Sequence, residues 1–245
     1  MTESKAQYDD NEFFSEYQQM LRSKEGLKGA GEWHQLKEML PKDFKGKRVL
    51  DLGCGYGWHC TYAIDQGAAS VVGVDNSSKM LEKAREINNS ANIEYVEATM
   101  ETYNYPEAKF DIIISSLAFH YVENFQDLVN NINKSLVPGG HLVFSVEHPI
   151  FTAYGSGDWI YDSDNKPLHW PVDKYYSEGI RHPNFLGKTI TKYHKTMTTY
   201  VNTLIQSGFN ITNLVEATPH PDMVKFMPDE LRRPMMLLVA AQKSA

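Results

Sequence analysis

Residues 49–60 read VLDLGCGYGWHC, in which three glycines fall within five positions directly after a short apolar run. Because glycine has no side chain, a loop of this kind lets the backbone approach a ligand closely. The run predicts a strand over residues 48–52, and residues 56–65 predict a helix. The next apolar run, SVVGVD over residues 70–75, ends on Asp75, which is placed to accept hydrogen bonds from ribose hydroxyls. This order predicts a site for an adenosine-containing ligand at the carboxyl edge of a parallel sheet.

Two details of the loop distinguish between adenosine-containing ligands. The dinucleotide fingerprint requires G-x-G-x-x-G, whereas here the third glycine comes one residue early and Trp58 occupies its position. Asp51 precedes the loop, and no Lys or Arg occurs between Leu50 and Thr61, so a pyrophosphate would meet a carboxylate. S-adenosylmethionine carries an ammonium and a sulfonium and has no phosphate, and it therefore fits better. A second interpretation, in which Asp51 is a helix-capping carboxylate, stays open.

The remaining chain continues the alternation of strands and helices. Strands are expected over 92–96, 110–115, 141–147, 209–217 and 235–242, and helices over 78–87, 124–136 and 195–207. Strand–helix–strand units at this spacing imply right-handed crossovers and a parallel sheet. We therefore expect an α/β fold, a doubly wound Rossmann-like sheet of about seven strands, mostly parallel with an antiparallel last strand.

We expect one domain over residues 1–245, built from four segments. These are a helical arm (1–45), a cofactor-binding core (46–147), a substrate-covering insertion (148–193) and a final helix and strands (194–245). The insertion contains four prolines and shows no sustained periodicity. No apolar run is long enough to span a membrane and the first residues lack a secretory pattern, so we expect the cytoplasm. The sequence indicates no oligomeric state.

Four segments together resemble a known family. VLDLGCGYG (49–57), VVGVDNSSKML (71–81), FDIIISSLAFHYVEN (110–124) and LVPGGHLVFSVEHP (136–149) resemble, in order and separation, the motifs of class I S-adenosylmethionine-dependent methyltransferases. The similarity covers roughly residues 47–148 and is greatest to the methyltransferase type 11 branch, which includes the ubiquinone and menaquinone biosynthesis enzymes.

The resemblance implies a set of S-adenosylmethionine-binding residues. Asp51, Gly53, Cys54 and Gly55 would line the methionine end, and Asp75 would bind the ribose. Asn76, Met80, Thr99 and Met100 would surround the adenine, and Ser115 and Ser116 would both lie beside the sulfonium. The family usually has Asp where Thr99 stands, and a hydroxyl accepts a hydrogen bond from the adenine amino group more weakly than a carboxylate does.

Candidate catalytic residues come from the same sheet edge. His120 follows the fourth strand and is either a general base or a residue that positions its loop through a hydrogen bond. Glu147 and His148 end the fifth strand, and His194 closes the insertion; each is either catalytic or a loop-bracing residue. No metal is expected, because no histidine pair has ligand spacing and Cys54 and Cys60 have no zinc partners.

The acceptor of the methyl group is indicated only in outline. The insertion contains many Phe, Trp and Tyr residues, which suit an aromatic or apolar small molecule, although a long loop also needs such residues for its own core. The net charge is −7 and no run of Lys and Arg exceeds two residues, so no nucleic-acid partner is expected. We expect methyl transfer to a small molecule. The alternatives are a tRNA, rRNA or protein methyltransferase, an NAD(P)-dependent oxidoreductase, and a binding module without turnover.

Overall fold

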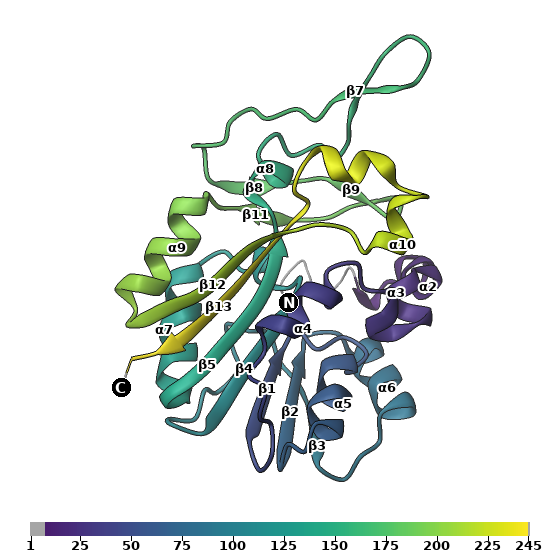
Figure 1. Cartoon of the computed structure of the whole chain (residues 1–245). Helices are drawn as coiled ribbons and strands as arrows, with labels where there is room; N and C mark the ends of the chain where they lie inside the picture. Colours follow the sequence, from purple (N-terminus) through teal and green to yellow (C-terminus); the bar gives the residue numbers. More distant parts are fainter. Residues whose placement is uncertain (1–7, 245) are drawn as a thin grey trace.

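The apolar runs of the chain assemble into one seven-stranded sheet (Figure 1). The structure, a computed structural model, describes residues 8–244. The strand order is β12-β13-β5-β4-β1-β2-β3. The strands are β1 (Arg48–Leu52), β2 (Ser70–Asp75), β3 (Ile93–Glu97), β4 (Phe110–Ser116), β5 (Leu136–Glu147), β12 (Phe209–Ala217) and β13 (Met236–Lys243). β13 runs antiparallel to both of its neighbours and all other pairs are parallel, which confirms the predicted fold class.

The order of the strands reverses between β1 and β4 in the middle of the sheet. From β1 the chain passes outward to β2 and β3, and from β4 it passes outward to β5 on the other side. A crevice opens outside the carboxyl ends of the strands at such a switch point. Leu52, Asp75 and Ser116 end β1, β2 and β4, and so they lie along this edge.

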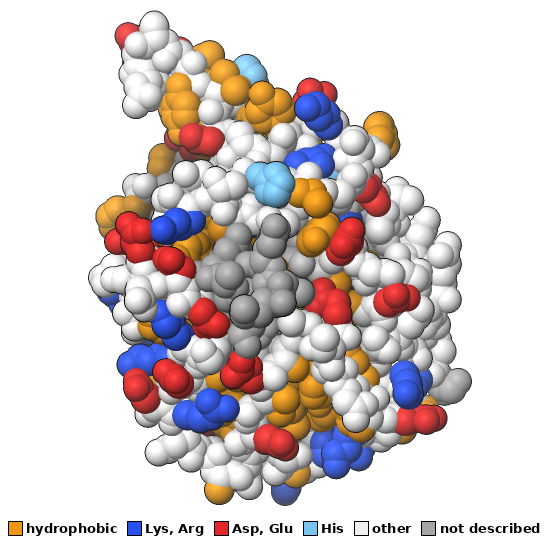
Figure 2. Space-filling model, turned by 180° about the vertical axis from the view of Figure 1, so that it is seen from behind, with side chains coloured by type: hydrophobic (Ala, Val, Ile, Leu, Met, Phe, Trp, Pro, Cys, Tyr) orange, Lys and Arg blue, Asp and Glu red, His pale blue; other side chains and the backbone are white. Residues whose placement is uncertain are grey.

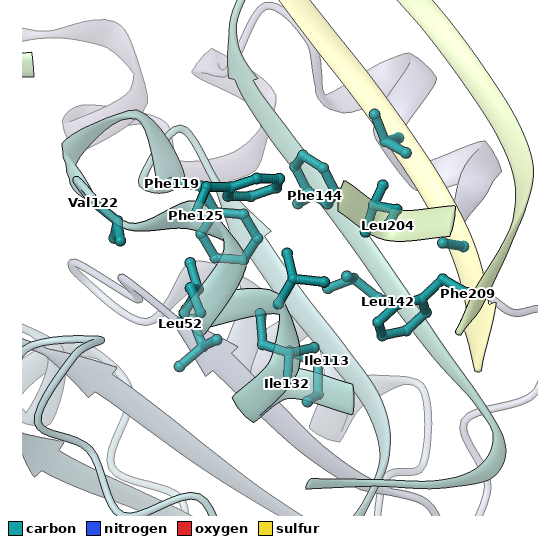
Figure 3. Packing of buried hydrophobic residues seen from close by; sticks show 14 of the residues in the cluster. Leu52, Ile113, Phe119, Val122, Phe125, Ile132, Leu142, Phe144, Leu204 and Phe209 are labelled. Carbon is teal, nitrogen blue, oxygen red and sulfur yellow. The ribbon is translucent and has the colours of Figure 1, made fainter. Parts of the chain in front are cut away.

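Helices cover both faces of the sheet (Figure 1). They are α4 (Trp33–Met39), α5 (Trp58–Asp65) and α6 (Ser78–Ile87) on one face, and α7 (Phe125–Ser135) and α9 (Met197–Gln206) on the other. In the core between the sheet and the helices α7 and α9, Phe125 of α7 and Phe144 of β5 pack around Phe119 of the short helix η2 (Phe119–Tyr121) (Figure 3). Each core is a continuous apolar cluster, so the sheet edge above it is held rigidly.

Three segments lie over the carboxyl edge of the sheet (Figure 1). The N-terminal arm contains α2 (Asn11–Gln19), α3 (Leu21–Lys24) and η1 (Gly26–Gly29) before α4. The insertion contains α8 (Pro149–Thr152), β6 (Ile160–Tyr161), β7 (Pro167–His169), β8 (Gly179–Arg181), β9 (Asn184–Phe185), β10 (Lys188–Thr189) and β11 (Lys192–His194). The β12–β13 connection, residues 218–235, contains α10 (Pro221–Val224) and η3 (Pro228–Arg232).

Aromatic and cationic side chains join the insertion to the β12–β13 connection. The guanidinium of Arg233 lies 4.2 Å from the ring centre of Trp170 and 4.9 Å from that of Phe151. Those two rings stack on each other with centres 4.8 Å apart. Arg233 also pairs with Glu230 at 2.7 Å. The insertion is therefore fixed to a second segment that covers the same edge.

Some boundaries differ from the sequence prediction for identifiable reasons. α5 begins at Trp58 and not at residue 56, because Gly57 is its N-cap with a left-handed φ of 73°. The arm breaks at η1, where a Cβ on Gly29 would lie 2.3 Å from the backbone oxygen of Leu21. β5 already begins at Leu136, with an irregular register opposite Phe110. Between residues 8 and 244 no helix combines the length and apolarity needed to cross a bilayer.

Candidate active site

A cavity of about 440 Å³ lies where the arm, the insertion and the β12–β13 connection cover the ends of β1, β2 and β4. Its wall includes Gly53, Cys54 and Gly55 of the glycine loop and Asp75 at the end of β2. The opposite wall comes from the arm and from the end of the insertion. The sheet edge that the sequence predicts to bind a ligand therefore borders a cavity, and the three segments cover it.

The three glycines of the loop differ in what their missing side chains make possible. A Cβ on Gly53 would lie 2.4 Å from the Cβ of Ala118, and one on Gly57 would lie 2.3 Å from the hydroxyl of Tyr95. A Cβ on Gly55 would meet nothing within 4 Å. Gly53 and Gly57 are thus needed for close packing inside the protein, whereas Gly55 borders the open cavity.

Asp75 connects the glycine loop to the start of α6. Its Oδ2 accepts a hydrogen bond of 2.9 Å from the N–H of Gly55, and its Oδ1 accepts one of 2.9 Å from the N–H of Ser77. Burial raises the pKa of Asp75, and the two N–H donors act in the opposite direction. Each carboxylate oxygen can accept a further hydrogen bond, so both stay available to a ligand.

The predicted adenine-binding residues also line the cavity: Asn76, Met80, Thr99 and Met100. The hydroxyl of Thr99 is 3.0 Å from that of Thr102 and accepts a hydrogen bond of 3.1 Å from the Thr102 N–H. Thr99 therefore already uses part of its hydrogen-bonding capacity within its own turn. Met100 packs beside Gly53, and its Cε lies 3.7 Å from the position of a Gly53 Cβ.

Asp51 lies beneath the glycine loop and does not line the cavity. Its Oδ2 accepts a hydrogen bond from the Cys60 thiol at 3.3 Å, whereas its Oδ1 has no hydrogen-bond partner within residues 8–244. Burial raises the pKa of Asp51 to about 7. Asp51 is thus a strongly desolvated carboxyl group with one unsatisfied oxygen.

Ser115 points away from the cavity, contrary to the position that the sequence suggested. Its hydroxyl donates a hydrogen bond of 2.7 Å to the backbone oxygen of Leu52, and the residue is fully buried. The next residue, Ser116, lines the cavity and donates a hydrogen bond of 3.0 Å to Glu32 Oε1. Side chains alternate between the two sides of a strand, so the neighbouring serine takes the cavity position.

A buried pair of opposite charges from the arm forms part of the wall. Arg22 Nη2 lies 2.9 Å from Glu32 Oε1, and the side chain of Glu32 is 2% exposed. Burial alone would raise the pKa of Glu32, but Arg22 and the hydrogen bonds to the carboxylate, among them one from Ser116, together outweigh burial and the pKa is lowered. Within the described chain the second oxygen, Oε2, has no hydrogen-bond partner. Sequence reasoning missed both residues, because no local pattern relates the arm to the sheet edge.

A second buried pair lies at the insertion end of the cavity. The ammonium of Lys192 forms an ion pair with Glu147 Oε1, and both side chains line the cavity. Burial would raise the pKa of Glu147, but Lys192 and His120 outweigh it and the pKa is lowered. The N–H of Glu147 donates a hydrogen bond of 3.3 Å to His120 Nδ1.

Comparison with known proteins decides the family. A family model described as a methyltransferase domain matches residues 50–144. The crystal structure of an S-adenosylmethionine-dependent methyltransferase from Mesorhizobium loti has a TM-score of 0.81 and 42% identity, and covers 89% of this chain and 100% of its own. The chain belongs to the class I S-adenosylmethionine-dependent methyltransferases.

Two further relatives span nearly the whole methyltransferase. A solved Listeria monocytogenes structure, described as a candidate S-adenosylmethionine-dependent methyltransferase, has a TM-score of 0.83 and 46% identity, and covers 88% of this chain and 99% of its own. An uncharacterized protein from Haemophilus influenzae is 34% identical over 245 residues, with 96% of each chain covered. The similarity therefore includes the arm and the insertion as well as the core.

Of the four candidate catalytic residues of this methyltransferase, two line the cavity and two do not. His120 and Glu147 line it. His148 instead accepts a hydrogen bond of 3.1 Å from the N–H of Ile150 as the N-cap of α8, and its Nε2 lies 3.0 Å from Glu216 Oε1. His194 Nδ1 lies 2.7 Å from the Thr152 hydroxyl, and its Nε2 lies 2.8 Å from a backbone oxygen. The structure thus gives His148 and His194 the loop-bracing positions that the sequence left as the alternative.

The tautomer of His120 limits what this residue can do. Burial lowers the pKa of His120 to about 3, so the ring is neutral at neutral pH. Because Nδ1 accepts a hydrogen bond from the N–H of Glu147, the single ring proton is on Nε2. In this state His120 offers a hydrogen-bond donor and not a base. Across residues 8–244, no group of three or more His, Cys, Asp or Glu side chains is arranged to hold a metal ion.

Proposed function

We propose that this methyltransferase binds S-adenosylmethionine along the glycine loop and transfers its methyl group to a small molecule held under the arm and the insertion. The observation that carries the proposal is the covered cavity, which Asp75 and the pair Arg22–Glu32 line together. Asp75 would accept hydrogen bonds from the uncharged ribose. Arg22 and Glu32 would pair with the carboxylate and the ammonium of the methionine portion.

The methionine end fits the charges of the wall. Glu32 lines the cavity, and its buried Oε2 has no hydrogen-bond partner within residues 8–244, so a ligand ammonium would satisfy it. The guanidinium of Arg22 supplies the cation that the ligand carboxylate requires. A pyrophosphate would be repelled by the Glu32 carboxylate, which argues against the nicotinamide-dependent oxidoreductase.

The part of the wall around Asp75 fits the uncharged adenosine, because it offers hydrogen-bond acceptors and apolar side chains. The free lone pairs of Asp75 would accept the two ribose hydroxyls, and Gly55 leaves room for the ribose beside them. Met80 and Met100 offer polarizable side chains to the faces of the adenine. Cys54 and Asn76 complete this part of the wall.

Catalysis by this chain is mainly alignment and exclusion of water. Bound S-adenosylmethionine supplies an activated methyl group on a sulfonium, and in-line attack requires an acceptor that is held in place. Tyr8 and Tyr121, whose hydroxyl oxygens are 3.0 Å apart, close the arm over the cavity and keep solvent out. His120 orients an acceptor atom through its Nε2 proton. Glu147 and Lys192 hold fixed charges beside it.

Several features favour a small acceptor over a nucleic acid. The cavity lies beneath three covering segments, whereas an RNA base must reach a methyl group from outside. Acidic and basic side chains are interspersed on the face shown in Figure 2, and the net charge of the chain is −7. The cytoplasm stays the expected compartment.

The proposal is tested by supplying S-adenosylmethionine labelled at the methyl group together with fractions of a cell extract. The fractions are metabolites, total RNA and proteins, each incubated with the wild-type protein and with Asp75→Ala. We expect S-adenosylhomocysteine and label in the metabolite fraction with the wild-type protein only. Label transferred to RNA or protein would favour those alternatives, and tight binding with no transfer in any fraction would favour a binding module without turnover.

A further inference from the structure

The ion pair between Glu147 and Lys192 joins the end of the sheet to the end of the insertion. Glu147 is the last residue of β5, and Lys192 is the first residue of β11. Their side chains are 13% and 6% exposed, and both face the cavity that would hold the acceptor. Burial opposes the Lys192 ammonium, but Glu147 outweighs it and raises the pKa of Lys192. Both groups are therefore charged at neutral pH.

Stability alone is a weak reason for such a pair. Removing two charges from water is unfavourable, and apolar residues of similar size in their place often leave a protein as stable or more stable. The surroundings are otherwise apolar and aromatic, since the ammonium of Lys192 lies 5.8 Å from the ring centre of Tyr121 and 5.3 Å from that of Phe185. A charged pair that borders a ligand cavity in such surroundings is a candidate recognition element.

The two charges of the pair cancel each other, and the three rings packed near them are neutral. His120, whose ring accepts from the N–H of Glu147, is neutral. The phenols of Tyr8 and Tyr121 are neutral too, because burial raises the pKa of each. A ligand with one charge would be attracted by one member of the pair and repelled by the other. A ligand with two opposite charges would be attracted by both.

A pair of the same kind, Arg22 and Glu32, also lines the cavity and faces the place proposed for the methionine, itself a zwitterion. We infer that the acceptor is also a small zwitterion, with a carboxylate that binds Lys192 and an ammonium that binds Glu147. This inference rests on the proposed function and names the substrate class of its acceptor site. The ring of Tyr121 gives the ammonium an additional partner, since aromatic faces attract cations. The His120 Nε2 proton gives the carboxylate a second donor.

The test uses matched sets of probes on protein saturated with S-adenosylhomocysteine. Each set contains an amino acid, its deaminated acid and its decarboxylated amine, for example phenylalanine, 3-phenylpropionate and 2-phenylethylamine, and the sets cover the common amino acids. Calorimetry measures each dissociation constant. We expect at least one amino acid to bind about tenfold or more tightly than both of its singly charged counterparts, because it gains a second charge-assisted contact.

Variants separate recognition from a merely structural pair. In Lys192→Met the amino acid should lose its advantage over the amine, and in Glu147→Gln it should lose its advantage over the acid. The double variant, which leaves no unpaired charge, should bind S-adenosylhomocysteine as the wild type does and bind no zwitterion preferentially. If the variants change only the melting temperature, or if acids, amines or no probes bind preferentially in every set, the inference is wrong. Failure of the wild-type protein to bind S-adenosylhomocysteine would instead overturn the proposed function.

Discussion

The carboxylate of Asp75, at the end of β2, accepts a hydrogen bond of 2.9 Å from the backbone N–H of Gly55 in the loop after β1. The residue proposed to bind the ribose therefore also fixes the one loop glycine that borders open space. Binding and loop geometry depend on the same carboxylate, and this dependence leads to the first prediction.

Asp75→Ala should weaken S-adenosylhomocysteine binding about 10- to 100-fold, because the ribose loses charge-assisted acceptors and the loop loses a tether. Calorimetry measures the dissociation constant. Glu82→Ala, on the exposed face of α6, is the matched control and should leave the constant unchanged. An unchanged constant in Asp75→Ala would mean that the ribose binds elsewhere.

The raised pKa of Asp51, about 7, predicts a pH dependence of binding. Below that pH the ligand-free protein carries a proton on Asp51, and the charge of a ligand ammonium on the other side of the glycine loop favours its release. The dissociation constant of S-adenosylhomocysteine should therefore rise as the pH falls from about 7 to 5, by at most about tenfold per pH unit. Calorimetric titrations at several pH values measure the slope.

Asp51→Asn is the control for this pH dependence, and it should bind with a flat profile over the same range. An equal slope in both proteins would show that another group titrates. The same shift sets the sign for stability: the folded state binds the proton more tightly than the unfolded state, so the free energy of unfolding without ligand should decrease as the pH rises from about 4 to 7.

Arg22→Met should discriminate between ligands with and without the amino-acid portion. S-adenosylhomocysteine should bind about 10- to 100-fold more weakly, because its carboxylate loses the guanidinium. The affinity for 5′-methylthioadenosine, which has neither the ammonium nor the carboxylate, should change little. Equal losses for both ligands would indicate a general defect of the cavity and would remove the methionine end from Arg22.

Thr99→Asp should restore the acceptor that the family usually has at this position. The affinity for S-adenosylhomocysteine should rise by about three- to tenfold, because a carboxylate accepts from the adenine amino group more strongly than a hydroxyl that is shared with Thr102. S-inosylhomocysteine, which has an oxygen in place of that amino group, should bind more weakly to the variant. Parallel changes for the two ligands would contradict the placement of the adenine.

Arg233→Ala should loosen the insertion. It removes the cation that lies on Trp170 and Phe151 and leaves Glu230 without its partner. We expect the free energy of unfolding to fall by about 1–3 kcal/mol and proteolysis within residues 148–193 to accelerate. Lys225→Ala, which removes an exposed cation from the Phe226 ring, is the control and should change neither quantity.

Local patterns predict most of the fold, and the residues that they propose for the adenosine line one cavity. The bounds of β1, β2 and β12 match the prediction, since apolar runs between loops determine strands almost independently of distant residues. Gly55 follows β1 and Asp75 ends β2, so the same patterns predict that both lie at the carboxyl edge of the sheet. The sequence places both Ser115 and Ser116 beside the sulfonium, but only Ser116 lines the cavity, because periodicity gives the alternation but not its phase at a strand buried on both sides.

Residues brought together by tertiary structure could not be predicted. Glu32 meets Arg22, ten residues earlier, and Ser116, 84 residues later, and no spacing in the sequence signals either contact. Lys192 lies in an insertion without periodicity, and only the pairing of β11 with β8 fixes its position. His148 and His194 could act as acids or bases if their rings were free. In the structure the ring of His148 caps α8, and the ring of His194 contacts a backbone oxygen. A titratable side chain at the right topological edge is therefore a candidate only until its partners are known.

A crystal structure with S-adenosylhomocysteine bound would decide the arrangement of the ligand. We expect the ribose hydroxyls within hydrogen-bonding distance of Asp75, the carboxylate at Arg22 and the ammonium at Glu32 Oε2. The sulfur would then face the space between Tyr8 and His120. A ligand whose amino-acid portion points away from Arg22 and Glu32, or whose ribose does not meet Asp75, would contradict this expectation.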